Sequence, residues 1–237
     1  MGSTGSPATS SRTSEGQVRM SSRGVWIGLI ALYAIFFGWY TSFGGPLAPD
    51  EVSRYVALLE ERGLDPARVA VWRAFMESDT GDDFAMLNAI DLRDTPLPVE
   101  GVSPGATAEQ VLARYTRPFL GRAIRRASHP ILFGTAAGPA MDLWGIDGAE
   151  HWDAGGLVRY RSRRDLIEQA VAVGPSGVHA FKLAAMEKTI AYPLDPWFHA
   201  GDPRLLLGLL LVSVGLANQL RATSRRPRPP EVSASSA

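Results

Sequence analysis

The chain has 237 residues, enough for one domain of ordinary size or for a domain plus membrane segments. Its 24 Lys and Arg residues balance 24 Asp and Glu residues, so the net charge is zero and we expect no nucleic-acid partner. The absence of cysteine excludes disulfides, thiolate metal sites and a cysteine nucleophile.

The N-terminal part predicts a disordered tail followed by a membrane span. Residues 1–24 are rich in Ser, Thr and Gly, and such a segment cannot form a core. Residues 25–43 carry no charge and would extend about 28 Å as a helix, close to the thickness of a hydrocarbon core. Trp26 near one end and Trp39 and Tyr40 near the other are typical of interfacial aromatic belts. The alternative is a secretory signal peptide, but its apolar region is shorter.

A second span is predicted near the C-terminus. The predicted span covers residues 204–220, and residues 205–220 carry no charge. Arg204 and Arg221 lie on either side of this uncharged segment, so both side chains can snorkel toward headgroups. A buried or interfacial helix is the alternative, but the leucine-rich segment has no polar face, which an interfacial helix requires. Residues 221–237 are basic and rich in Pro and Ser, and we expect a disordered tail.

The charges of the tails predict the topology. Three Arg and one Glu give the N-terminal tail +2, and four Arg and one Glu give the C-terminal tail +3. The region between the spans has 17 basic and 22 acidic residues, a net −5. Because basic residues beside spans stay in the cytoplasm, we predict a two-span protein of the lipid bilayer with both termini cytoplasmic.

Residues 47–80 predict a helical hairpin. Apolar residues recur at helical spacing from Val52, and Gly63 is a suitable residue to end the first helix. Asp65 followed by Pro66 is a typical start for the second, which carries Trp72.

Residues 81–200 predict an α+β domain. Thr107 and Ser162 are typical N-caps of helices that separate segments of strand character. The strands are predicted at 84–92, 130–134, 156–161 and 188–192, and a short helix is predicted from about Ser176 to Met186. The order strand–helix–strand–strand–helix–strand indicates a ferredoxin-like βαββαβ domain with an antiparallel sheet, inserted between the two transmembrane helices.

The stretch His151-Trp152-Asp153, followed by residues 157–163, resembles small uncharacterised, monooxygenase-like members of the dimeric α+β barrel superfamily. Tyr115 and residues 131–133 occupy the usual places of the preceding helix and strand, and the likeness covers roughly residues 84–193. The turn at Arg161 lacks the proline that those proteins often carry. The resemblance implies a dimer, and its enzymatic relatives often need no metal or cofactor.

Three polar residues are the predicted catalytic candidates: Asn88, His151 and Asp153. A His and an Asp two residues apart can transfer protons near neutral pH. Asn88 falls on the apolar face of the first strand, where a buried amide needs a hydrogen-bond partner. The alternatives are a surface loop whose Trp packs on the sheet edge, and a structural hydrogen bond of Asn88.

Tyr115, Trp152 and Arg159 are the predicted ligand-binding candidates. Arg159 would either bind an acidic ligand or pair with Asp91 on a neighbouring strand. The four histidines show no metal-ligand spacing, so we expect no metal site and no cofactor. We expect His129 to complement a helix dipole.

Two functions remain open. The first is a membrane-anchored α+β domain that binds a small-molecule ligand or dimerises. The second is a cofactor-independent small-molecule oxidoreductase or isomerase. A pocket that gathers the three catalytic candidates favours the enzyme, and separation by more than about 10 Å favours the binding domain, because proton transfer requires hydrogen-bond reach.

The open face of the predicted sheet favours a homodimer. The first strand offers Leu87 between two alanines on one side and larger apolar residues on the other, so both faces have apolar content. The alternative is that the hairpin of residues 47–80 folds over the open face and makes a closed monomer.

Overall fold

The computed structural model describes residues 22–173 and 177–224. Most of both predicted tails, and Ser176 at the start of a predicted helix, lie outside the described residues. The chain divides into two compact units. One contains residues 1–33 and 208–237, and the other contains residues 34–207.

The first unit pairs parts of two long apolar helices, α1 (Ser22–Tyr40) and α7 (Pro203–Ser224). Both helices are long and apolar enough to cross a membrane. Gly215 of α7 lies against the indole of Trp26, where a Cβ would approach a ring atom to 2.4 Å. Trp26 also donates a hydrogen bond to Gln219 over 3.4 Å. A small residue at this contact lets the two helices approach closely.

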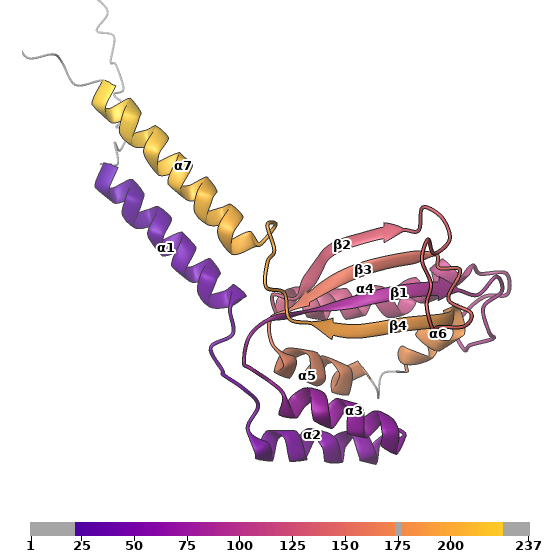
Figure 1. The fold of residues 1–237 in the computed structure, drawn as a ribbon. Helices are drawn as coiled ribbons and strands as arrows, with labels where there is room; N and C mark the ends of the chain where they lie inside the picture. The colour runs from indigo at the N-terminus through magenta and orange to yellow at the C-terminus, as the bar shows by residue number, and fades with distance from the viewer. Residues whose placement is uncertain (1–21, 174–176, 225–237) are drawn as a thin grey trace, which may run out of the picture. The chain divides into compact units, whose positions relative to one another are not determined.

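The second unit is built on a four-stranded antiparallel sheet in the order β2-β3-β1-β4 (Figure 1). The strands are β1 (Phe84–Leu92), β2 (His129–Thr135), β3 (Ala154–Tyr160) and β4 (Met186–Leu194). All four overlap the predicted strands, and β1 coincides with its prediction. The protein therefore has an α+β fold with apolar helices toward both ends of the chain.

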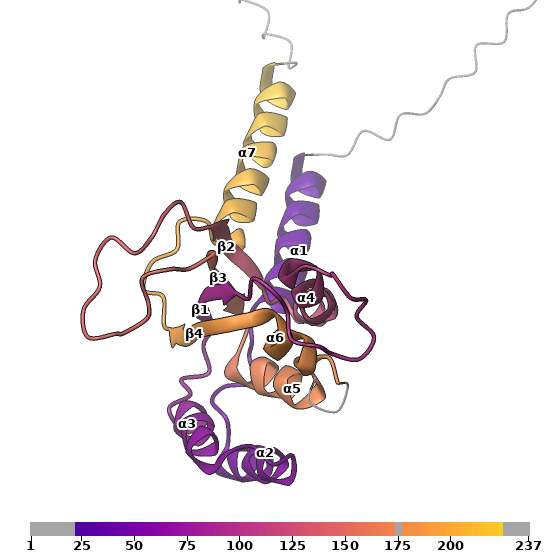
Figure 2. The same cartoon turned by 90° about the vertical axis from the view of Figure 1, so that its right-hand side faces the viewer.

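Three helices cover one face of this sheet (Figure 2): α4 (Ala108–Arg125), α5 (Arg163–Val173) and α6 (His179–Ala185). Phe84 stacks on Tyr160 with ring centroids 5.3 Å apart, and both pack against Leu166 of α5. Val111 of α4 is fully buried against Ala185 of α6. The even-numbered positions of β1 therefore face the helices.

The predicted caps fix where these helices begin. The Thr107 hydroxyl accepts the Gln110 backbone N–H, and the Gln110 side chain accepts the Thr107 N–H, which confirms the capping box. The Ser162 hydroxyl accepts the Asp165 N–H over 3.1 Å at the start of α5. Such local bonds satisfy backbone donors that the first helical turn leaves without partners.

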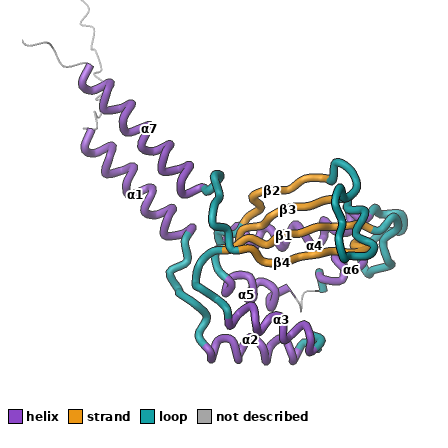
Figure 3. The backbone as a smooth tube through the Cα atoms, viewed as in Figure 1, coloured by secondary structure: helices purple, strands orange, loops and turns teal. Residues whose placement is uncertain are grey.

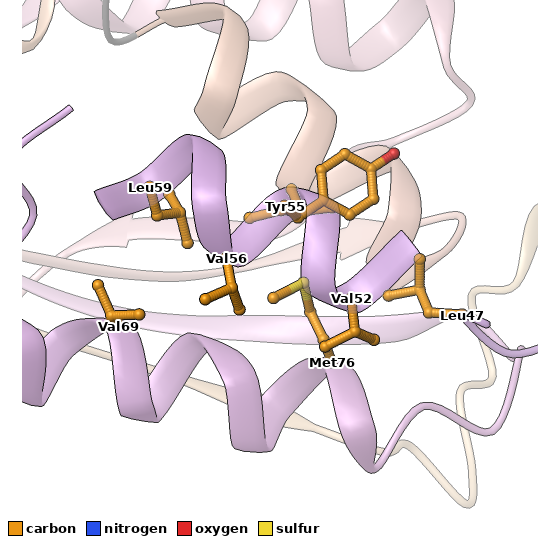
Figure 4. Packing of buried hydrophobic residues seen from close by; sticks show 8 residues of the cluster. Leu47, Val52, Tyr55, Val56, Leu59, Val69 and Met76 are labelled. Atoms are coloured by element: carbon orange, nitrogen blue, oxygen red, sulfur yellow. The ribbon is translucent and has the colours of Figure 1, made fainter. Parts of the chain in front are cut away.

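The hairpin of α2 (Pro49–Glu61) and α3 (Pro66–Glu77) packs on α5. Side chains from α2 and α3 point toward one another, and Ile167 of α5 joins the cluster (Figure 4). Trp72 and Phe75 pack against Phe84, on the side of the sheet that the helices cover. The hairpin thus extends the helical layer. The alternative role as a lid would require it to cover the opposite face of the sheet, and it does not.

The hairpin carries a pH-sensitive contact. Glu51 binds Arg164 of α5 over 2.8 Å and accepts the Ala48 N–H at the start of α2. The hydrogen bond from Arg164, helped by that of Ala48, lowers the pKa of Glu51 from 4.5 to about 2. The stabilisation is therefore fully present above pH 4.5 and is lost as the pH falls toward 2.

We expect Glu51→Gln to cost about 1 kcal/mol of unfolding free energy at pH 7, as for a partly exposed ion pair with a cap bond. The difference from the wild type should shrink as the pH falls below 4.5 and vanish only below pH 2. Denaturant unfolding of both proteins at several pH values measures this, with the exposed Glu60→Gln as the control. A constant difference across the range would contradict the assignment.

The second face of the sheet bears an apolar row that crosses all four strands. Leu132, Leu157, Leu87 and Tyr192 lie opposite one another in register. Leu132 is 64% exposed and Tyr192 is 45% exposed, and Ile190 beside them is 37% exposed. No helix of the described residues covers this row. The long loops after β1 and β2 leave the sheet at one end, beyond the row (Figure 3).

Candidate functional site

A polar cluster lies at that loop-bearing end of the sheet. Asp91, the penultimate residue of β1, is 8% exposed and points to the open face. Its Oδ1 lies 2.9 Å from Nδ1 of His151, whose side chain is 69% exposed. The buried carboxylate therefore orients the imidazole and leaves the other side of the ring toward solvent.

Asp153 belongs to the same cluster. Its Oδ2 accepts the Leu92 N–H over 2.6 Å, and its own N–H donates to the Ile90 carbonyl over 2.9 Å. One ligand atom from each of Asp91, His151 and Asp153 lies within 4.8 Å of the other two. These donor types suit a divalent cation. The structure thus unites two of the catalytic candidates through a third residue, Asp91.

Lys188 of β4 already supplies a positive charge to this cluster. Its Nζ lies 3.4 Å from the second carboxylate oxygen of Asp91 and donates to the Gly148 carbonyl. The same Nζ lies 5.1 Å from the ring centroid of Trp152, whose indole donates to the Ala149 carbonyl. Trp152 therefore connects its loop to β4. The ammonium group of Lys188 neutralises part of the negative charge of Asp91 that would attract a metal cation.

Asn88 and Tyr115 lie elsewhere. Asn88 is on the helix-covered face of β1 and donates to the Met86 carbonyl of its own strand over 3.0 Å. Tyr115 stacks on Phe119 within α4, and burial raises the pKa of its hydroxyl. Since neighbouring strand positions face opposite ways, Asn88 and Asp91 point to opposite sides of the sheet.

A second polar cluster lies at the other end of the sheet, where α1 ends and α7 begins. We call it the junction cluster, and it contains Tyr40, Asp83, Arg159, Asp202 and Arg204. Arg159 is 4% exposed, and its Nε and Nη2 donate to Asp83 over 2.8 and 2.6 Å. Its remaining donors reach the backbone carbonyls of Ala127 and Tyr40. All three side-chain nitrogens of Arg159 therefore donate hydrogen bonds within the protein.

Arg204 connects α7 to the same carboxylate. Its Nη2 lies 2.9 Å from Asp83 and also binds Asp202, two residues earlier in the chain. Burial opposes ionisation of Asp202, but the hydrogen bonds from Arg204 outweigh it and lower its pKa. The two arginines and the two aspartates balance in charge, so the cluster offers no net attraction to an anion.

Tyr40, the last residue of α1, is only 2% exposed and covers both arginines. Its ring centroid lies 3.7 Å from the Arg159 guanidinium carbon and 5.5 Å from that of Arg204. Its hydroxyl lies 2.7 Å from Nε2 of His129 at the start of β2. The contacts of Tyr40 and Arg204 bind the ends of both apolar helices to the sheet.

Two predictions are wrong at this cluster. Arg159 does not pair with Asp91, because the strand register places it opposite Ala85, at the other end of β1. His129 does not complement a helix dipole, because residues 126–128 separate it from α4 and it opens β2. The sequence contained no signal for the contacts of Arg159 with Asp83 and Tyr40, because both residues lie far from Arg159 along the chain.

The described residues line a small cavity beside the junction cluster. Its volume is about 220 Å³, and its lining includes Arg159, Arg204, Trp197 and His199. A wider hollow of about 400 Å³ lies beside Arg161 and Arg164. Neither contains Asn88, His151 or Asp153. The smaller cavity is below the usual range for small-molecule sites, about 300–1,000 Å³.

No protein-family model matches the chain, and no curated protein matches it. The solved structures that are similar include a protein of unknown function from Rhodopseudomonas palustris, at 22% identity and a TM-score of 0.45. That match covers 57% of this chain and 95% of the other. The methylated RPA0582 protein, also at 22% identity, gives a TM-score of 0.46 and covers 58% and 95%.

Proposed function

We propose that the chain is an integral membrane protein whose α+β domain lies outside the cytoplasm and self-associates through its open sheet face. The observation that carries the proposal is the apolar row of Leu132, Leu157, Leu87 and Tyr192, in which Leu132 and Tyr192 are exposed and the two central leucines are half-buried. A contiguous apolar surface that no helix covers is typical of a protein interaction site.

The topology rests on the two apolar helices and on the basic tails. Arginines beside both spans favour cytoplasmic termini, which leaves residues from about 46 to 202 outside. The tight binding of both helix ends at the junction cluster supports a domain that is held close to the bilayer.

A ferredoxin-like assignment is supported by the strand order β2-β3-β1-β4, with α4 between β1 and β2 and two helices between β3 and β4. In this arrangement the helices occupy one face, and two copies bury the other face against each other. Confinement to a membrane favours such a homodimer, because it raises the effective concentration of one copy near another.

The absence of native cysteine makes one experiment decisive for both parts of the proposal. Tyr192→Cys places a thiol on the open face, and Val71→Cys places one on α3, where Val71 is 70% exposed. Intact cells that express each full-length variant are treated from outside with an impermeant maleimide or bismaleimide. We expect the thiol at position 71 to be labelled from outside, and at least tenfold more cross-linked dimer from Tyr192→Cys.

Each part can fail separately. Protection of Val71→Cys until the cells are permeabilised would contradict the extracytoplasmic placement. Labelling of both thiols with equal or no cross-linking would contradict the dimer face. Leu132→Asp added to Tyr192→Cys should reduce the cross-linked fraction, because it buries a charge in the apolar interface.

The oriented His151 supports a second candidate, an enzyme that acts through proton transfer. Asp91 binds one ring nitrogen, which is how carboxylates position a general base. The candidate has weaker support, because Asn88 faces the other side of the sheet and neither cavity includes His151.

A further inference from the structure

Large aromatic side chains project into solvent beside the junction cluster. Trp197 is 97% exposed and Phe198 is 74% exposed, and their ring centroids lie 6.3 Å apart. Phe43, just beyond α1, is 73% exposed, and Trp39 in its last turn is 45% exposed. All four side chains lie within six residues of the point where an apolar helix ends or begins.

This placement sets them apart from the apolar row of the sheet. Trp197 and Phe198 follow the end of β4 and precede Pro203, the first residue of α7. The base of the sheet, where β1 and β2 begin and β3 and β4 end, therefore carries aromatic side chains from both connecting segments. Water is an unfavourable environment for so much exposed aromatic surface.

The membrane–water interface is the environment that suits these residues. Trp in particular is enriched at headgroup level, where its apolar ring contacts acyl chains and its N–H stays hydrated. Neighbouring polypeptide is a poorer match, because the described residues leave Trp197 almost wholly uncovered although it is only six residues from α7.

We propose that Trp197 and Phe198, together with Trp39 and Phe43, enter the headgroup region of the bilayer and seat the base of the α+β domain on the lipid surface. The partner is a phospholipid bilayer. The inference rests on the proposed membrane spans and adds that the segment before α7 is itself a lipid-contacting element.

The chain offers a matched control for this contact. Trp144, in the loop between β2 and β3, is 86% exposed, nearly as much as Trp197. The loop that carries Trp144 starts at the end of β2, so it lies at the opposite end of the sheet from Trp197. A residue of the same type and similar exposure should therefore stay in water.

The test uses the full-length chain with a single cysteine labelled with the environment-sensitive dye NBD, at Trp197→Cys, Trp144→Cys or Leu32→Cys. Leu32 is 51% exposed and lies near the middle of α1. The proteins are reconstituted into phosphatidylcholine vesicles that carry nitroxide quenchers at headgroup depth or deep in the acyl chains. We expect headgroup nitroxides to quench the dye at 197 at least threefold more than at 144. The acyl-chain nitroxides should quench the dye at 32, in the middle of α1.

The outcomes separate the two proposals. Equal and weak quenching at 197 and 144, with strong acyl-chain quenching at 32, would overturn the lipid contact and leave the membrane span intact. No acyl-chain quenching at 32 would overturn the span and the lipid contact with it. Phe198→Cys provides a second labelled position, and it should behave like 197 if the segment lies in the interface.

Discussion

Replacing Arg159 by Met should lower the free energy of unfolding by about 3 kcal/mol. Breaking a buried ion pair from one side costs about 3–5 kcal/mol, because the remaining charge keeps its desolvation cost. The low end applies here, because Arg204 still faces Asp83. The variant also leaves two backbone carbonyls without their donor and removes the cation from beside Tyr40.

The effect can be measured by denaturant unfolding of the full-length protein in detergent micelles, followed by circular dichroism. Arg125→Met is the matched control, because Arg125 is exposed on α4 and should change stability by less than about 0.5 kcal/mol. Equal stability of the two variants would show that the junction cluster does not hold the domain together.

Gly81→Ala should also destabilise the protein strongly. Gly81 has a φ of +86°, and a Cβ there would lie 2.8 Å from the backbone of Gly45 and Pro46. The substitution therefore combines left-handed backbone strain with a clash against the segment that follows α1. Backbone atoms cannot yield as the end of a flexible side chain can, so the cost includes an overpacking penalty of about 1–3 kcal/mol.

Gly105→Ala isolates the clash from the strain. Gly105 has nearly the same φ, +83°, but no atom lies within 4 Å of the position of its Cβ. The difference in unfolding free energy between the two variants should be about 1–3 kcal/mol, with Gly81→Ala the less stable. No difference would mean that residues 45–46 move away freely, and that this close approach does not position the linker.

The local elements were predictable because their signals are local. The alternation from Phe84 to Leu92 gave β1 with its observed bounds, and Asp65, Thr107 and Ser162 begin helices as expected. The first apolar helix ends at Tyr40, three residues before the predicted span ends. Helix ends depend on the local turn, which composition alone does not specify.

The candidate site was predictable only in part. His151, Trp152 and Asp153 are neighbours in sequence and remain neighbours in the structure, as their common loop requires. Their partners Asp91 and Lys188 come from two other strands, and only the register of β1 with β4 brings those residues together. Asn88 is separated from the cluster because side chains alternate between the two faces of a strand, and Asn88 lies three positions before Asp91.

The sequence alone determined the segments: two apolar helices, a helical hairpin and an α+β region with its strands and caps. These depend on hydrophobic periodicity and on hydrogen bonds that span a few residues. Only the tertiary structure decided which charges meet. Asp83 and Arg159 are 76 residues apart, and Arg204 joins them from 121 residues beyond Asp83. Such pairs form because strand register and helix packing place the two residues together. A buried charge without an opposite charge beside it would keep its full desolvation cost.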